Sequence, residues 1–166
     1  MKVAPIPGNE PARLEKLRQY RILDTAAEKV FDDITRLAAE VCGAPISLIT
    51  FIDAERQWIK AKVGIHVSET RREVAFCAHA ILQPDLFVVP DATRDERFAD
   101  NPLVTGEPRI RFYAGMPLVT ADGHAVGSLC VIDRVPRELS EEQRAKLKVL
   151  AQGAVMLLEQ RLPAGA

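Results

Sequence analysis

Cys77 and His79 stand two positions apart in the apolar segment "VAFCAHAIL" (74–82). A thiol this near an imidazole could be half of a metal site, a nucleophile beside its base, or two side chains that never meet. The alanine content of the segment favours a short helix ended by Pro84, although so short an apolar run also fits a strand. On a helix, residues two apart differ by about 200° in direction, so Cys77 and His79 would point apart. On a strand they would lie on the same face.

A metal site would need further ligands, and the candidates are His66, His124 and Cys130. Their spacing resembles no zinc pattern. A nucleophilic Cys77 would need a lowered pKa and an adjacent base. We therefore predict no metal site and no catalytic residue, with Cys77 as a core side chain and His79 as a pocket-wall or hydrogen-bonded residue.

Charged residues crowd the segment from 91 to 111. Its arginines and acids are Arg94, Arg97, Arg109 and Arg111, with Asp91, Asp95, Glu96 and Asp100. Arginines beside a pocket would suit a carboxylate or phosphate, because a guanidinium group donates two parallel hydrogen bonds to such groups. The interleaved acids favour the alternative, an ion-pair network that pins a long loop. Arg111 is the arginine best placed to face a ligand, since it leads a strand that carries Tyr113.

Aromatic side chains near this segment are candidates to line a pocket, because concave binding sites are mostly apolar. They are Phe76, Phe98, Phe112 and Tyr113. Phe112 and Tyr113 are neighbours on a predicted strand and therefore face opposite ways. We expect Phe112 to pack in the core.

Composition limits the functions open to the chain. Its 166 residues suffice for one domain, and a net charge of −1 provides no field to attract nucleic acid or an anionic membrane. Aromatic residues make up only 5%, too few for stacking on single strands. The three widely spaced cysteines suit a reducing cytoplasm, and no apolar stretch is long enough for a signal peptide or a membrane span. We expect a cytoplasmic protein that binds neither nucleic acid nor membrane.

Helix signals dominate both ends of the chain. Asn9 is a candidate N-cap for a short helix through Tyr20, and Thr25 with Glu28 predicts a capping-box start for a second helix that stops at Gly43. Its predicted core-facing stripe is Val30, Ile34, Leu37 and Val41. Ser140 with Gln143 predicts the cap of a long final helix. Its predicted seam, available for the sheet or for a second subunit, is Leu147, Leu150, Ala154 and Leu157.

Strand signals lie between these helices. "ISLITFID" (46–53) predicts a central strand buried on both faces, and "RQWIKAKV" (56–63) a half-exposed hairpin partner. "LFVVP" (86–90) predicts another strand, and an Asp-Gly turn at 122–123 predicts a second hairpin. The order favours an α+β fold: an antiparallel sheet with helices on one face. We expect a flexible lead at 1–8, one domain at 9–162 and a tail at 163–166.

Nearly the whole chain resembles the GAF domain family, more closely the GAF domains near the N-terminus of bacterial histidine kinases and diguanylate cyclases. The similar stretches include "RLEKLRQYRILDTAAEKVFDDITRLAAEVCGAPISLITFID", "RQWIKAKVGI", "FCAHAI", "VVPDATRDERFADNPLV" and "IRFYAGMPLVTADGHAVGSLCVIDRVPREL". The resemblance implies a twisted antiparallel sheet of about six strands, with N- and C-terminal helices on one face and a loop-covered pocket on the other. Five strands are predicted above, so a sixth would lie in the polar stretches.

Some family properties are not matched by these residues. GAF domains that attach a bilin carry a Cys-His dipeptide, whereas Ala78 separates Cys77 from His79, so no covalent bilin is expected. The signature of cyclic-nucleotide-binding members is not reproduced in the region from Asp95 to Arg111. Free methionine sulfoxide reductases of this family group their redox cysteines closely, and here the cysteines are scattered in the sequence.

The resemblance implies a non-catalytic sensory domain that binds a small molecule and signals through its terminal helices in a homodimer. The kind of ligand stays open, and a downstream kinase or cyclase domain is expected in a longer chain or in trans. The predicted ligand-binding residues are Phe76, His79, Asp91, Phe98, Arg111 and Tyr113. Two alternatives remain open: a reductase-like redox enzyme, which requires two cysteines within disulfide reach, and a dimerisation module without a ligand.

Overall fold

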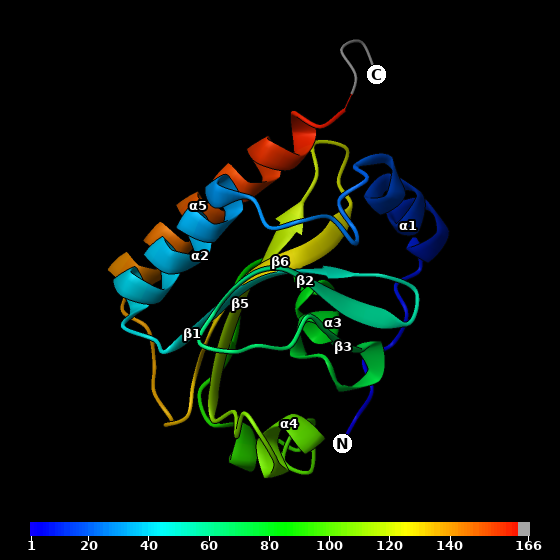
Figure 1. Cartoon of the computed structure of the whole chain (residues 1–166). Coiled ribbons are helices and arrows are strands. Elements are labelled where there is room, and N and C mark those ends of the chain that lie inside the picture. Colours follow the sequence, from blue (N-terminus) through cyan, green and yellow to red (C-terminus); the bar gives the residue numbers. More distant parts are fainter. Residues whose placement is uncertain (163–166) are drawn as a thin grey trace.

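Two hairpins build the sheet at the centre of the computed structural model, which describes residues 1–162 (Figure 1). β1 (Ile46–Ile52) pairs with β2 (Arg56–Val63), and β5 (Phe112–Val119) pairs with β6 (Ala125–Asp133). The hairpins join because β1 and β6 pair antiparallel, and the short strands β3 (Glu69–Arg71) and β4 (Phe87–Val89) form the two edges. The strand order is β3-β2-β1-β6-β5-β4. The predicted α+β fold is confirmed, and the sixth strand is β3, in a polar stretch.

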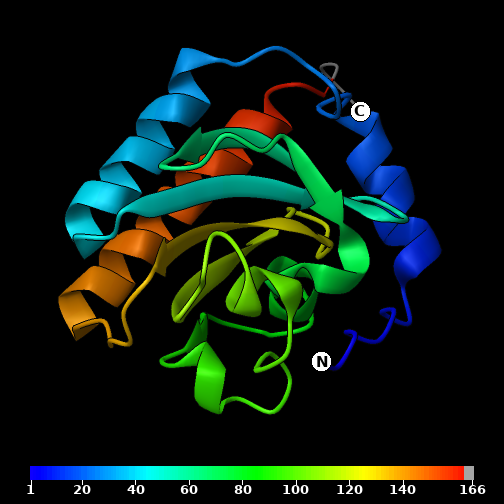
Figure 2. The same ribbon diagram turned by 60° about the horizontal axis from the view of Figure 1, so that its bottom comes forward.

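Two long helices cover one face of the sheet. α2 (Lys29–Cys42) and α5 (Glu141–Glu159) lie side by side there, whereas α1 (Glu10–Gln19) lies at the end of the sheet where the turns of both hairpins are (Figures 1 and 2). α5 begins at the predicted capping box, in which the Ser140 and Gln143 side chains each bond the other's backbone N–H. Gly43 ends α2 in the left-handed conformation that glycine adopts readily, as predicted.

The buried face of α2 differs from the predicted one. Ile34 and Val41 of the predicted stripe are partly buried and pack against the core, but Val30 and Leu37 are 49% and 41% exposed. The side chains that face the sheet are Phe31, Thr35, Ala38, Ala39 and Cys42. Apart from Phe31 these are small, so the helix can lie close to the sheet, and the bulkier stripe turns toward α5 and the outside. The start of α2 was also predicted too early, because the Thr25 hydroxyl bonds the Ile22 carbonyl within the preceding turn.

β2 is more buried than its alternating pattern predicts. The β1–β2 register shifts between Ile49 and Thr50, which leaves Lys60 as the extra residue of a bulge. The Lys60 ammonium group is fully buried and lies 2.6 Å from a Glu28 carboxylate oxygen. The bulge and this ion pair let Lys60 lie on the helix-covered face of the sheet. The predicted half-exposed strand had placed this lysine on the solvent side.

Short elements cover the opposite face of the sheet. α3 (Phe76–Ala80) lies against the sheet beside β3, and α4 (Pro102–Thr105) lies in the long connection between β4 and β5 (Figure 2). The predicted short helix in the 74–82 segment is therefore confirmed. Residues 1–8 run along this side: the backbone N–H of Lys2 bonds the Arg97 carbonyl, and Ala4 is buried. Residues 163–166, predicted as a tail, lie outside the described residues.

Candidate ligand cavity

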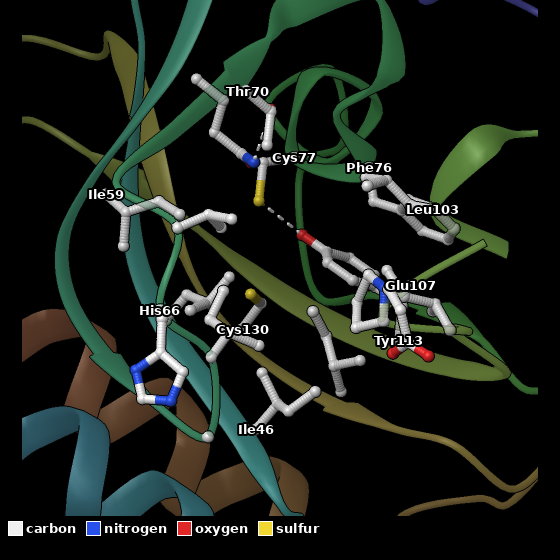
Figure 3. Close-up of a pocket in the computed structure, with 18 of the residues that line it drawn as sticks. Ile46, Ile59, His66, Thr70, Phe76, Cys77, Leu103, Glu107, Tyr113 and Cys130 are labelled. Atoms are coloured by element: carbon white, nitrogen blue, oxygen red, sulfur yellow. Dashed lines mark hydrogen bonds between the residues drawn. The ribbon is translucent and has the colours of Figure 1, made fainter.

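A cavity of about 340 Å³ lies between the sheet and the segments that cover its second face (Figure 3). Alternate residues of the central strands form its floor, because successive side chains of a strand point to opposite faces. The floor and walls are mainly apolar. The buried apolar lining is Ile46, Leu48, Ile59, Phe76, Ile110 and Ile132, with Ile65, Leu103 and Pro108 completing the walls.

The mouth of the cavity carries its charged residues. Glu107 and Arg134 line it and are exposed, as is His66. The Arg134 Nε–H donates to the Pro108 carbonyl at 3.0 Å, which holds the guanidinium group at the rim. Among the described residues that line the cavity, the buried ones carry no carboxylate, guanidinium or ammonium group.

A polar cluster lies at the floor of the cavity, around the Cys77 thiol. The Ser128 hydroxyl donates to Cys77 Sγ at 2.9 Å, and the Tyr113 hydroxyl lies 3.0 Å from the same sulfur (Figure 3). Cys130 adds a second thiol to the lining, and Thr50 lies 3.5 Å from the Ser128 hydroxyl. α3, β1, β5 and β6 thus each contribute one or two members.

These neighbours change the acidity of Cys77. Burial opposes ionisation, but hydrogen bonds from the Cys130 thiol and from the surrounding hydroxyl groups outweigh it and lower the pKa of Cys77 to about 7. Burial raises the pKa of Cys130 well above its usual value, and the adjacent Cys77 adds to this effect. Cys77 is therefore the member of the pair that ionises first.

Cys77 and His79 do not meet. The Cys77 thiol faces the cavity, whereas His79 Nε2 bonds the Lys2 carbonyl oxygen at 3.0 Å. The His79 ring also packs edge-on against Phe98, and burial lowers the pKa of His79. This outcome follows the helical interpretation of the segment, in which the two side chains diverge.

Two of the six predicted ligand-binding residues, Phe76 and Tyr113, line the cavity. Phe98 lies behind Phe76, with ring centroids 4.0 Å apart, and so supports the wall. His79 is directed toward the N-terminal lead, as described above. Two further predicted residues stabilise the segment 91–111 that covers this side of the sheet. The Asp91 carboxylate accepts from the Thr93 backbone N–H, and Arg111 donates to the Val104 and Ile110 carbonyls. The cavity lining therefore does not include four of the predicted residues: Phe98, His79, Asp91 and Arg111.

The charged cover segment contains the expected local ion pairs. Arg97 pairs with Asp95 at 2.6 Å, and Arg94 lies 3.7 Å from Asp91. Arg97 also lies over the rings of Phe87 and Phe98. Arg109 lies 3.7 Å from Glu107, so three of the four arginines of this segment have an acidic partner close by in the sequence.

Gln57 and Cys130 line the cavity but are not among the predicted ligand-binding residues, and Cys130 was considered only as a metal ligand. Both lie on strands that have one face toward the cavity and the other toward the helices. The alternation of residues along a strand shows which ones share a face, but it does not show which of the two faces lines a cavity. Cys42, by contrast, packs on the helix-covered face. The sheet therefore separates Cys42 from the two cavity thiols.

The sequence profile of the GAF domain family matches residues 26–157. A curated relative, the cyclic di-GMP phosphodiesterase PA2567 of Pseudomonas aeruginosa, is 47% identical over 152 residues. The match covers 91% of this chain but only 26% of that protein. Within residues 1–162, we find no helix that is both long enough and apolar enough to span a membrane.

Solved structures share the fold. The GAF domain of an Acinetobacter phosphoenolpyruvate-protein phosphotransferase superposes with a TM-score of 0.68 at 19% identity, covering 90% of this chain and 93% of that one. A type II free methionine-R-sulfoxide reductase from Thermoplasma acidophilum gives a TM-score of 0.64 at 15% identity, covering 87% and 94%. Sheet order, helix placement and sequence profile agree, and the chain belongs to the GAF domain family.

Proposed function

We propose that this chain is a cytoplasmic sensory domain that binds a small molecule in the cavity and passes the signal on through α2 and α5. The observation that carries the proposal is the shared floor: β1 and β6 present one face to the cavity and the other to the helices. A ligand that shifts these strands would alter helix packing without contacting the helices. The cavity volume falls in the range typical of small-molecule sites.

The output is proposed to be a catalytic domain carried in the same longer chain or supplied in trans. The relative from Pseudomonas aeruginosa is named as a cyclic di-GMP phosphodiesterase, and this chain matches about a quarter of it. We infer regulation of an enzyme of cyclic-dinucleotide signalling or of a kinase, with no catalysis by the domain itself. Among residues 1–162, the buried side chains that line the cavity include no cationic group, which argues against a dinucleotide as the ligand.

The domain is further proposed to act as a homodimer through α2 and α5. Val149 and Met156 are each 64% exposed and lie one heptad apart on α5, and Val30 and Leu37 are exposed on the neighbouring α2. Exposed apolar side chains at heptad spacing suit pairing with a second copy of the same helices.

Native mass spectrometry of freshly purified protein, with an absorption spectrum, tests the binding proposal. We expect a bound molecule, or a rise in melting temperature with members of a small-molecule library. A Leu103→Trp variant, which fills the cavity from its wall, should lose both, and Val119→Trp, at an exposed position outside the cavity, should not. If no molecule is retained and none stabilises the wild-type protein, the sensory proposal fails.

The two cavity thiols favour a second candidate function, a reductase. The thiols of Cys77 and Cys130 would reduce a sulfoxide bound in the cavity, giving a sulfide, one disulfide and one water that takes up the sulfoxide oxygen and both thiol protons. Incubation with free methionine sulfoxide should then produce a Cys77–Cys130 disulfide in peptide mapping, which Cys130→Ser prevents. Thiols that stay reduced while the substrate is unchanged would rule this function out.

A further inference from the structure

Gln57 has a buried hydrogen-bonding atom without a partner. The residue lies on β2, lines the cavity and is 95% buried, since only 5% of its surface is exposed. Its Nε2 donates to the Thr70 hydroxyl at 3.2 Å, and that hydroxyl in turn donates to the Arg71 carbonyl. Its Oε1 has no partner among the described residues.

Such an atom is costly when it stays unpaired. A buried acceptor that is stripped of water and left without a donor destabilises the folded protein. Thr70 cannot satisfy both ends of the amide, because it already bonds Nε2 and Arg71. Of the other buried polar groups in the lining, Cys77 and Tyr113 are bonded to each other and to Ser128, and the Cys130 thiol is only a weak acceptor. Among the described residues that line the cavity, Gln57 Oε1 is thus the buried side-chain oxygen left without a donor.

The rest of the cavity restricts the charge of that molecule. Apart from these groups its buried wall is apolar and, among the residues described, carries no carboxylate, guanidinium or ammonium group. A thiolate at Cys77 would repel an anion, and its charge is already held by the Ser128 and Tyr113 hydroxyl groups, so a charged group deep inside would lose its hydration without gaining a matched counter-charge. A charge is accommodated only at the mouth, near Arg134 and Glu107. The volume of about 340 Å³ exceeds the roughly 150 Å³ that holds a benzene in an engineered cavity, so a bicyclic molecule has room.

We propose that the ligand of this cavity is an uncharged, mainly apolar molecule of about two rings whose single buried O–H or N–H donates to Gln57 Oε1. This inference rests on the proposed sensory function and specifies the chemical class of its ligand. Gln57 is then the residue that sets specificity, because it distinguishes a molecule with a donor from one of the same shape without it.

Indole and benzofuran make a matched pair of probes, since they share shape and size and only indole has an N–H. Titration calorimetry on the full chain should show indole binding about tenfold more tightly than benzofuran, as expected for one satisfied buried acceptor. In Gln57→Leu the preference should vanish through weaker indole binding, with benzofuran unchanged or tighter. Gln57→Met serves the same purpose if Gln57→Leu does not fold, and Gln83→Leu, at an exposed glutamine outside the cavity, is the control.

The outcomes separate this inference from the function it rests on. Equal binding of both probes by the wild-type protein, or an indole preference that survives in the Gln57 variants, overturns the role of Gln57 but leaves a ligand-binding cavity. Binding of neither probe at millimolar concentration overturns the inference, and together with a failed library screen it overturns the sensory function too.

Discussion

The side chains around Cys77 show how neighbours determine the chemistry of a buried thiol. Hydroxyl groups of Ser128 and Tyr113 lie 2.9 and 3.0 Å from the sulfur, and both can donate to it when it is ionised. A charged acceptor gains more from such bonds than a neutral one. Among the residues that the structure describes, the thiolate is therefore supported by hydroxyl and thiol groups, and the sequence neighbour His79 bonds Lys2 instead.

Replacing Tyr113 by phenylalanine should make Cys77 less acidic. The variant removes one donor to the thiolate, so we expect the pKa of Cys77 to rise by about one unit. Labelling of Cys77 by a small alkylating reagent at pH 7 should slow several-fold, with the midpoint of the rate-against-pH curve displaced upward, as measured by peptide mapping. Tyr20→Phe, whose hydroxyl bonds Glu159 instead, should leave the curve in place. An unchanged curve in Tyr113→Phe would contradict the role given to this hydroxyl.

Glu10 links α1 to Arg72, in the turn that follows β3. Its carboxylate receives hydrogen bonds from Arg13 at 2.9 Å and from Arg72 at 2.5 Å, and Arg13 is 1% exposed. Burial opposes ionisation of Glu10, but the two arginines lower its pKa from 4.5 to about 2. Because the folded-state pKa is depressed, the associated stability is complete above about pH 5 and is lost as the pH falls toward 2.

A Glu10→Gln variant tests this linkage. The difference between wild type and variant in free energy of unfolding should be on the order of 3 kcal/mol larger at pH 7 than at pH 2. Urea denaturation at pH 7, 5 and 3 gives the trend. Glu15→Gln, at an exposed position of the same helix, should give a small difference that does not vary with pH. A Glu10→Gln difference that stays constant across this range would refute the assignment.

At the scale of elements, the contact between β1 and β6 positions both the cavity floor and the helix-covered core. Gly127 on β6 pairs with Phe51 on β1, and a Cβ built at Gly127 would lie 1.9 Å from the Thr50 carbonyl oxygen. The two backbones approach so closely that only glycine fits. The register of the central pair therefore depends on a residue without a side chain.

Gly127→Ala should accordingly destabilise the domain by about 2–4 kcal/mol, since backbone must move to admit the methyl group. Thermal unfolding followed by circular dichroism measures the loss. Gly153→Ala is the matched control: its Cβ meets only Ile34 Cδ1 at 3.9 Å, so a slight gain in stability is expected from higher helix propensity. Equal melting temperatures for the two variants would show that the strands can separate at little cost.

The sequence predicted elements better than it predicted their orientation. The helix ends and the second hairpin were predicted from residues that act on the backbone next to them: Gly43, Ser140 and the Asp-Gly turn. Such signals can be seen in the sequence because they depend only on near neighbours along the chain. The face that α2 buries depends on α5, more than a hundred residues away, and periodicity alone selected Val30 and Leu37 instead. β3 was missed because three polar residues at an edge carry almost no pattern.

The candidate site was predicted less completely for the same reason. Phe76 and Tyr113 were found because aromatic side chains in an apolar context suggest a wall. Gln57 acquires its importance only from what surrounds its Oε1 in space: an apolar cavity and a threonine that is already bonded. No local pattern distinguishes such a glutamine from a surface one.

At the scale of the whole molecule, the α2–α5 surface is the part proposed to join a second copy. Glutamate at both Val149 and Met156 would place like charges at the centre of that contact, where they repel their counterparts across a twofold axis. The doubly substituted protein should sediment as a monomer at concentrations where the wild type is a dimer. Ile6→Glu, exposed in the N-terminal segment on the other side of the sheet, should remain dimeric. A dimer that persists in the double variant would place the contact elsewhere.

The alternation along β1 and β6 has a consequence for how such domains diversify. Leu48, Cys130 and Ile132 face the cavity, whereas Ile49 and Leu129 face the helices. A mutation therefore falls on one side or the other, seldom on both. A lineage can exchange the side chains of the cavity face and acquire a different ligand. The helix-facing side chains, and with them the contact proposed to transmit the signal, can stay unchanged.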